Sequence, residues 1–330
     1  MKTILITGVA GLLGAHLSRH LLDRGFSVIG IDDLSGGFES SVDKRVTLYT
    51  INLSSEVTVN DIFESHRPSH VYHLAAYAAE GLSPYIRRHN YINNVVCSAN
   101  VINACVNYAV EKIIFTSSMA VYGTGIPPFT EDQLPSPEDP YGIAKYAVEM
   151  DLRLAKEQFD LNYSIVRPHN VVGVYQNIWD RYRNVIGIWI RQCMNNDPIT
   201  IFGDGTQVRA FSDIRFYMRP FERLMTEYDG EIFNIGADKE WTINEAAELV
   251  MKVAYELGYE PDIIHLEKRN EVHTAYSDHT KARDLLGFED RTVLEDTIRD
   301  MFKWAENEPT HPVEYFDYEI EKNLYSFWKK

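Results

Sequence analysis

The N-terminal part of the chain alternates between short apolar stretches and segments in which apolar residues recur at helical spacing. Residues 2–6 and 26–31 are rich in Ile and Val, which is typical of buried parallel strands. Between them Leu17, Leu21 and Leu22 fall on one face of a helix. This stretch therefore predicts a strand, a helix and a second strand in succession.

The same alternation continues to residue 166. We expect further strands at 46–51, 70–74, 112–115 and 163–166, and helices at 57–66, 84–108 and 141–159. Strands that alternate with helices predict an α/β fold, a Rossmann-type doubly wound parallel sheet whose ligand lies at the carboxyl ends of the strands.

Beyond Arg167-Pro168 the elements become shorter and are separated by Gly and Pro turns. A strand at 199–202 precedes Gly203-Asp204-Gly205. We therefore predict two parts with a discontinuous boundary. Their limits are 1–170 for an NAD-binding Rossmann domain with a late strand near 230–236, and 171–330 for a smaller α/β substrate-binding lobe that includes a tail at 310–330.

Glycines at positions 8, 11 and 14 stand between the first strand and the first helix. A strand, a glycine turn and a helix N-terminus together present backbone N–H groups and the positive end of a helix dipole to a pyrophosphate. Asp32 ends the second strand, where a carboxylate accepts both ribose hydroxyls of an adenosine and repels a 2′-phosphate. The segment predicts an NAD site, and a glycine turn without a ligand is the alternative.

Composition excludes several kinds of partner. The formal net charge of −16 argues against binding to nucleic acid or to anionic membranes. We find no apolar run of membrane-spanning length, and we expect no signal peptide, because the first strand follows Met1 directly. Cys97, Cys105 and Cys193 lack metal-binding spacing, so we expect no metal site, reduced structural cysteines and a cytoplasmic protein.

The candidate chemistry lies on the helix predicted at 141–159. Tyr141 and Lys145 are one helical turn apart and share a face, so the Lys145 ammonium favours a phenolate and brings the pKa of Tyr141 closer to neutral. A phenolate can take the proton of a substrate hydroxyl while a hydride leaves the same carbon. Ser118, at a strand end, can hydrogen-bond the same oxygen. A chance pair on a solvated helix, and a serine that only caps backbone, are the alternatives.

From residue 1 to about residue 305 the chain resembles the extended branch of the short-chain dehydrogenase/reductase superfamily, the NAD-dependent sugar-nucleotide epimerases and dehydratases. The resemblance is carried by the glycine spacing, by Tyr141 and Lys145, and by Ser-Ser-Met-Ala-Val-Tyr-Gly at 117–123. It implies catalytic roles for Tyr141, Lys145 and Ser118. It also implies that NAD is bound by Gly8, Gly11, Leu12, Leu13, Gly14, Asp32, Asn52, Leu53, Leu74, Ala75, Ala76, Asn94, Thr116, Tyr141, Lys145 and Pro168.

The resemblance further implies a nucleotide-sugar substrate. Its contacts would be Ser83, Ser117, Ser118, Asn170, Asn184, Val185, Phe202, Arg209 and Arg269. Asn170 and Asn184 match positions near the diphosphate, Phe202 matches a position that stacks on the base, and a guanidinium fork at Arg209 or Arg269 suits phosphate. Surface salt bridges are the alternative for both arginines.

Residue differences narrow the reaction that the resemblance implies. Dehydratases of the family place Asp and Glu after the catalytic hydroxyl, where this chain has Met119 and Ala120. The Glu of decarboxylating relatives and the Cys of 3,5-epimerases are also absent there. A 4-epimerase acting on a UDP-hexose is therefore expected. A nucleotide-sugar dehydrogenase or an epimerase at another carbon, UDP- or GDP-linked, and a non-catalytic NAD-binding scaffold remain open.

The sugar itself is less constrained. Tyr175 and Gln176 stand where relatives that act on glucuronate have an Arg, which favours a neutral hexose, although Arg181 and Arg183 lie close in sequence.

Three further features concern assembly and departures from the family. The helices expected at 84–108 and 141–159 resemble the pair through which relatives dimerise, so we expect a homodimer. Arg215 and Phe216, in the segment 212–217, replace two acids of the family, so we expect the pocket edge to be altered. The tail after Pro312 has no family counterpart, and we expect it to pack on the second lobe or on the partner subunit without taking part in chemistry.

Overall fold

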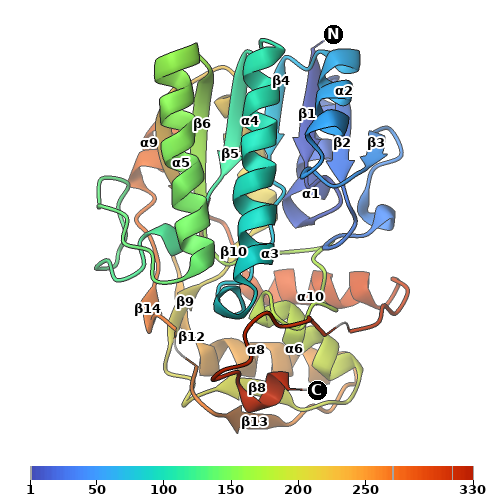
Figure 1. The fold of residues 1–330 in the computed structure, drawn as a ribbon. Coiled ribbons are helices and arrows are strands. Elements are labelled where there is room, and N and C mark those ends of the chain that lie inside the picture. Colours follow the sequence, from blue (N-terminus) through green and yellow to red (C-terminus); the bar gives the residue numbers. More distant parts are fainter. Residues whose placement is uncertain (1, 270, 314, 330) are drawn as a thin grey trace.

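The computed structural model describes residues 2–269, 271–313 and 315–329. Met1, Asn270, Glu314 and Lys330, which fall within the predicted domains and tail, lie outside the described residues. Seven parallel strands form the central sheet in the order β11-β6-β5-β4-β1-β2-β3 (Figure 1). Their bounds are Thr3–Thr7 (β1), Ser27–Asp32 (β2), Thr47–Thr50 (β3), His70–His73 (β4), Lys112–Thr116 (β5), Asn162–Pro168 (β6) and Glu231–Ile235 (β11). The predicted Rossmann-type α/β fold is confirmed.

Helices cover both faces of this sheet. One face carries α2 (Glu56–His66), α4 (Cys97–Asn107) and α5 (Pro140–Phe159), and the other carries α1 (Leu12–Asp23), α7 (Met218–Leu224) and α9 (Thr280–Leu286). Ile4, Leu5 and Ile6 of β1 are fully buried. Burial on both faces explains why the strands read as continuous apolar runs rather than as alternating ones.

The helix expected at 84–108 is not uniform. It follows a 3-10 turn at Ser83–Tyr85 and consists of α3 (Arg87–Tyr91), a π-helical segment at Ile92–Val96, and α4. In the π segment the buried Asn94 side chain accepts the Tyr77 N–H at 3.0 Å and donates to the Tyr77 carbonyl at 3.1 Å. The wider turn lets this amide reach the loop after β4, which explains an asparagine at a buried helical position.

The second part of the molecule lies beyond the carboxyl ends of the strands (Figure 1). Its helices are α6 (Val185–Met194), α8 (Ile243–Glu256) and α10 (Leu294–Ala305), which share one apolar core. Three small sheets join β8 (Ile199–Phe202) to β13 (Ile263–Leu266), β7 (Val171–Val172) to β10 (Ser212–Asp213), and β9 (Val208–Ala210) to β12 (Glu240–Thr242) and β14 (Thr274–Ala275). Because β11 pairs with β6, the chain returns to the main sheet after entering this part, and the limits at 170 and 171 remain a prediction.

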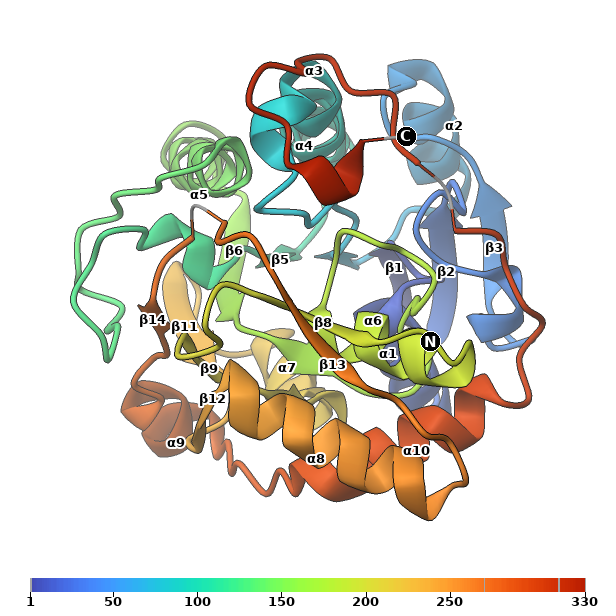
Figure 2. The same cartoon turned by 90° about the horizontal axis from the view of Figure 1, so that it is seen from below.

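The end of the chain forms a strap, residues 315–329, beside α3 (Figure 2). Leu324 and Trp328 are buried against Ala79, Leu82 and Ile86 of the loop after β4. The Glu319 carboxylate accepts the backbone N–H groups of Arg88 and His89 at 2.7 and 2.9 Å. Tyr182 and Glu267 of the second part also hydrogen-bond the strap, so it bridges both parts of the molecule. Within the described residues, no helix is both long and apolar enough to cross a membrane.

Candidate functional site

The glycine turn between β1 and α1 is packed so closely that side chains do not fit. A Cβ on Gly14 would lie 2.2 Å from the Gly8 carbonyl oxygen. Gly8 has φ +71°, and a Cβ on it would lie 2.8 Å from the Ala75 backbone. The turn therefore brings the end of β1, the start of α1 and the segment after β4 together, which leaves backbone at the surface for a pyrophosphate.

Asp32 is fixed at the end of β2 by two backbone hydrogen bonds. Its carboxylate accepts the Ala10 N–H and the Leu34 N–H, both at 2.9 Å. Burial raises the pKa of Asp32, while these two hydrogen bonds lower it. An ionised carboxylate offers about four lone-pair positions, so capacity for ribose hydroxyls remains.

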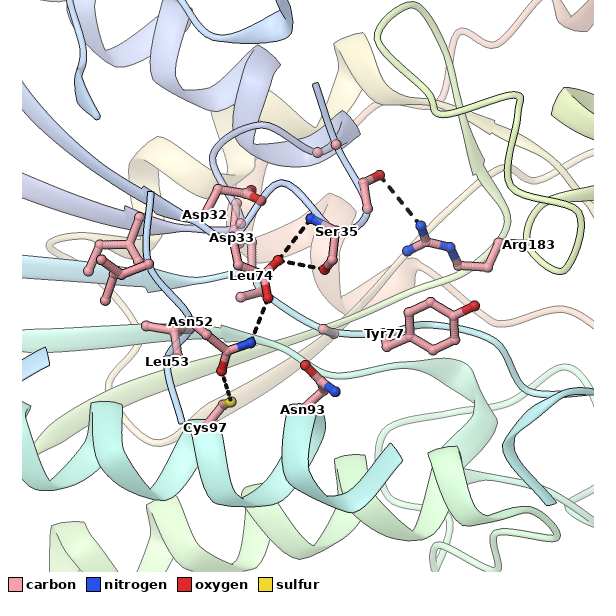
Figure 3. A pocket seen from close by; sticks show the side chains of 18 residues that line it. Asp32, Asp33, Ser35, Asn52, Leu53, Leu74, Tyr77, Asn93, Cys97 and Arg183 are labelled. Carbon is pink, nitrogen blue, oxygen red and sulfur yellow. Dashed lines mark hydrogen bonds between the residues drawn. The ribbon is translucent and has the colours of Figure 1, made fainter. Parts of the chain in front are cut away.

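Figure 3 shows the pocket beside Asp32. Of the residues predicted to bind NAD, its lining includes Gly8, Gly11, Asp32, Asn52, Leu53, Leu74, Ala75 and Ala76. Asn52 donates to the Asp33 carboxylate at 2.6 Å, and Asp33 also accepts the Ser35 N–H at 3.0 Å. Asn52 was expected to contact adenine, and its amide N–H is already hydrogen-bonded to the neighbouring Asp33 carboxylate.

Sequence reasoning missed several lining residues of this pocket, among which Arg183 matters most. Its guanidinium pairs with Asp180 at 2.7 Å and lies 4.9 Å from the centre of the Tyr77 ring. It also borders Gly36 and lines the second cavity described below. The local sequence hints at this part of the pocket only through Gly36 and Gly37. A Cβ on Gly37 would lie 2.4 Å from the Ala10 carbonyl oxygen, so the chain needs glycine there to pass close to the glycine turn.

Two predicted contacts lie behind the pocket walls instead of lining them. The Asn94 amide is engaged with Tyr77, and it also donates to Asn90 at 2.8 Å. The Ser83 hydroxyl donates to the Glu80 carbonyl at 2.8 Å. Both side chains are buried, and their geometry supports a role in positioning the loop after β4 rather than direct ligand contact.

The catalytic candidates come together on the wall of a second cavity of about 780 Å³. Asp139 caps α5 by accepting the Tyr141 and Gly142 N–H groups at 2.8 and 2.9 Å, which orients the first turn of the helix. Lys145 Nζ donates to the Thr116 carbonyl at 2.8 Å and lies 5.8 Å from the centre of the Tyr141 ring. Ser118 lines the same cavity as Tyr141, and its hydroxyl accepts the Ala120 N–H at 3.1 Å.

The pKa values of this group reflect burial more than mutual attraction. Desolvation lowers the pKa of Lys145 to about 7, with Glu149 acting in the opposite direction. Desolvation, followed by the charge of Glu80, raises the pKa of Tyr141 above its ordinary value, and the nearby Ser118 side chain lowers it. The expected depression of the Tyr141 pKa by Lys145 is therefore not produced by the protein groups alone.

Most of the remaining predicted residues line the same cavity. Its lining includes Leu12, Leu13, Gly14, Thr116, Ser117, Pro168, Asn170, Asn184, Val185, Phe202, Arg209 and Arg269. Ser117, Asn170 and Asn184, together with Gln176 and Gln207 of the lining, each have a buried polar atom without a hydrogen-bond partner among the described residues. Because such atoms cost free energy when unpaired, these side chains favour a ligand rich in polar groups.

The arginines and Phe202 are more engaged than the sequence predicts. Arg209 donates to the carbonyl oxygens of Val208, Val272 and His273 at 2.6 to 3.0 Å. The Arg269 guanidinium lies 4.0 Å from the centre of the Phe202 ring. The centre of the Phe327 ring, in the strap, lies 4.2 Å from the centre of the Phe202 ring. Arg269 is therefore the better placed of the two for a phosphate, and the stacking positions beside Phe202 already hold protein groups.

The segment 212–217 does not alter the pocket lining. Asp213 is buried, pairs with Arg215 at 2.6 Å, and accepts the Thr297 hydroxyl at 2.7 Å. Asp213, Arg215 and Phe216 line neither cavity. The departure from the family thus concerns the contact between β10 and α10, both within the second part of the molecule.

Residues 4–236 match the sequence model of the NAD dependent epimerase/dehydratase family. The chain belongs to this family. A putative UDP-glucose 4-epimerase of Methanocaldococcus jannaschii is 28% identical over 312 residues, which cover 92% of this chain and 98% of that protein. A UDP-glucuronate 4-epimerase of Thermodesulfobacterium geofontis is 27% identical over 322 residues, covering 92% and 96%.

A solved structure shows the same likeness. The UDP-glucose 4-epimerase of Thermotoga maritima with UDP-glucose has a TM-score of 0.87 and 30% identity to this chain, covering 92% of this chain and 98% of that one. The glycine turn without room for a Cβ and the fixed Asp32 carboxylate fit the NAD that the family requires.

Proposed function

We propose that this protein is an NAD-dependent nucleotide-sugar 4-epimerase that acts on a UDP-hexose. The observation that carries the proposal is one cavity with Tyr141, Lys145 and Ser118 on one wall and unpaired polar side chains on another. Family membership and similarity to proteins named UDP-glucose 4-epimerase support the same function.

The residues that would hold NAD divide by the part of the cofactor they meet. The glycine turn and Arg183 suit the pyrophosphate, Asp32 the adenosine ribose, Asn52 and Leu53 the adenine. Thr116, Lys145 and Pro168 line the larger cavity, where they would hold the nicotinamide end of the cofactor. Bound NAD would supply the hydride acceptor and donor for the sugar carbon, together with the positive charge of its nicotinamide ring.

Tyr141 would accept the proton of the C4 hydroxyl, and Ser118 would hydrogen-bond the same oxygen. Burial keeps the phenol neutral on its own, so positive charge beside it is needed for it to act as a base near neutral pH. The 4-keto sugar would then turn about its diphosphate, which Asn170, Asn184 and Arg269 are placed to hold. Tyr141 would finally return the proton to the oxygen on the other sugar face.

Anomeric-proton NMR with UDP-glucose and no added NAD tests this function. We expect signals of UDP-galactose to appear and approach equilibrium, because the cofactor is regenerated in each turnover. Conversion that requires stoichiometric NAD would favour the nucleotide-sugar dehydrogenase. A panel of UDP- and GDP-sugars extends the test to epimerisation at another carbon, and no conversion of any sugar would favour a non-catalytic scaffold.

The Tyr141→Phe variant tests the proposed base. General acid–base catalysis contributes about 10² to 10⁴ in rate, so kcat should fall by at least about 100-fold while NAD binding persists. Unchanged turnover would remove Tyr141 from this role, and lost NAD binding would point to a structural defect.

We also propose a homodimer through the helical regions 84–108 and 141–159, in which α4 and α5 lie side by side (Figure 1). Val96 in the π segment before α4, and Ile143, Met150 and Leu154 on α5, expose between 39% and 45% of their surface. Apolar side chains gathered on two neighbouring helices suit a bundle with a second copy. Light scattering should give twice the mass of the chain, and Met150→Glu with Leu154→Glu should halve it.

A cytoplasmic location is a further part of the proposal. Cys97, Cys105 and Cys193 are buried and unpaired to one another, as suits a reducing compartment. Fractionation of the producing cells, followed by immunoblotting, tests this location.

A further inference from the structure

The loop between β4 and α3 brings a carboxylate, Glu80, into the larger cavity, and the steps above do not use it. Glu80 is open to the cavity instead of packed in the core. Within the described part of the chain, its carboxylate makes no hydrogen bond and no ion pair. A charged acceptor without a protein partner is thus available to a ligand.

Hydrogen bonds fix Glu80 relative to the proposed base. The Ser83 hydroxyl donates to the Glu80 carbonyl at 2.8 Å and accepts the Tyr141 N–H at 3.3 Å. One side chain therefore links the backbones of Glu80 and Tyr141. On the other side, a Cβ on Gly81 would lie 3.8 Å from Arg269. Glu80 thus stands between the residue that marks the reacting carbon and the arginine placed for the diphosphate.

The strap makes this loop rigid. Ala79 and Leu82, which flank Glu80 and Gly81, are buried at 2% and 0% exposure in the cluster formed with Leu324 and Trp328. A loop clamped by apolar packing holds a charge in a constant position, so that the charge can discriminate between ligands.

The charges around Glu80 are of both signs. Tyr141 and Asp139 face it from the start of α5, Arg209 from β9, and Arg269 and Glu271 from the segment after β13. Desolvation within the cavity, followed by the charge of Asp139, raises the pKa of Glu80 to about 7. Glu80 is therefore ionised at mildly alkaline pH and neutral at mildly acidic pH.

We propose that Glu80 determines sugar specificity, by accepting hydrogen bonds from a neutral hexose and by repelling the C6 carboxylate of a hexuronate. The inference rests on the proposed function and names its substrate class. A sugar whose C4 meets Tyr141 and whose diphosphate meets Arg269 spans the space beside Glu80. Hydroxyl groups donate well to a carboxylate, whereas like charges brought together in a cavity disfavour binding.

Arg181 and Arg183 do not offset this repulsion. Arg181 donates to the Phe327 carbonyl at 2.7 Å and lies over the Tyr315 ring, so it is committed to the strap. Arg183 pairs with Asp180 and borders the cofactor pocket. Neither Arg181 nor Arg183 is therefore left for a uronate.

Isothermal titration with UDP, UDP-glucose and UDP-glucuronate tests the proposal. NAD-saturated protein with Tyr141→Phe is used, so that neither sugar is consumed, with and without Glu80→Gln. We expect UDP-glucose to bind at least about tenfold more tightly than UDP-glucuronate, and Glu80→Gln to reduce this ratio to below about threefold by improving UDP-glucuronate binding. UDP, which carries no sugar, should bind equally to both.

Two variants separate charge from folding. Glu80→Asp keeps the charge and should keep most of the selectivity. Glu248→Gln removes an exposed glutamate of α8 that lines neither cavity and should change nothing. The ratio should also rise between pH 6 and pH 8 in the protein with Glu80, because the carboxylate gains its charge in this interval, and stay constant in Glu80→Gln.

The outcomes distinguish a failure of the role of Glu80 from a failure of the proposed function. An unchanged ratio in Glu80→Gln, with normal UDP binding, would overturn the role of Glu80 alone. Tighter binding of UDP-glucuronate than of UDP-glucose to the protein with Glu80 would also overturn it. Absence of binding for all three ligands would overturn the proposed function.

Discussion

Replacement of Glu149 by Leu should destabilise the protein strongly, because Glu149 forms a buried ion pair behind the catalytic helix. Arg167 of β6 donates two hydrogen bonds to the Glu149 carboxylate, at 2.9 and 2.6 Å. The two side chains expose only 2% and 3% of their surface. Arg167 also donates to the Tyr122 hydroxyl at 2.8 Å, which cannot neutralise its charge.

The expected cost follows from what remains after the substitution. A buried guanidinium without its counter-charge typically costs about 3–5 kcal/mol. For a chain of this length about 2 °C of melting temperature is lost per kcal/mol, so the midpoint should fall by roughly 6–10 °C. Urea unfolding followed by circular dichroism, together with a thermal scan, measures both quantities.

Two controls use the same helix and the same strand. Glu157→Leu removes the partner of Arg153, an exposed pair at 4.0 Å, and should cost less than about 1 kcal/mol. Glu149→Leu combined with Arg167→Met removes both charges and should recover most of the lost stability. Equal effects of Glu149→Leu and Glu157→Leu would refute the reasoning, since burial would then not decide the cost.

Three further predictions concern the turn, the buried lysine and the strap. Gly14→Ala should lower the unfolding midpoint and weaken NAD binding at least about tenfold, because its Cβ would meet backbone at 2.2 Å. Gly11→Ala, with its nearest atom at 3.5 Å, should leave the midpoint unchanged, and equal midpoints for the two variants would contradict this. Lys145→Met should abolish turnover yet stabilise the protein at neutral pH, because burial lowers the pKa of Lys145 to about 7. The unfolded state keeps that proton up to a higher pH, so the gain should shrink between pH 7 and pH 10, and a gain independent of pH in urea titrations would argue against it. Trp328→Ala should lower the free energy of unfolding by about 3–5 kcal/mol and raise KM for the nucleotide sugar. Ile320→Ala, at a 41% exposed site, should change neither quantity. A normal KM for Trp328→Ala would show that the strap does not support the cavity.

The central sheet and the glycine turn were predictable because local sequence determines them. Strands such as β1 are buried on both faces, so their apolar runs stand out, and the turn requires glycine at positions fixed by backbone contact. Tyr141 and Lys145 share a helix face for the same local reason. The residues that these elements position could therefore be named from the pattern alone.

Residues whose role depends on distant loops could not be found in this way. Arg183 reaches the cofactor pocket because the loop before α6 crosses Gly36, and no periodicity records such a crossing. Glu80 looks like an ordinary loop acid until Ser83 ties its backbone to Tyr141. Asn94 was expected at the cofactor, yet the π segment turns its amide toward Tyr77. In each case tertiary contacts, rather than local preference, decide where the side chain lies.

The position of the strap has a consequence for synthesis of the protein. Ala79, Leu82 and Ile86 leave the ribosome about 230 residues before the strap that buries them. At about 5–20 residues per second, this apolar patch stays uncovered for roughly 10–50 s in every nascent chain. The sheet can form in that interval, but the wall that carries Glu80 cannot yet be clamped. In each newly made chain, the packing that holds the Glu80 loop therefore forms only after the strap has left the ribosome.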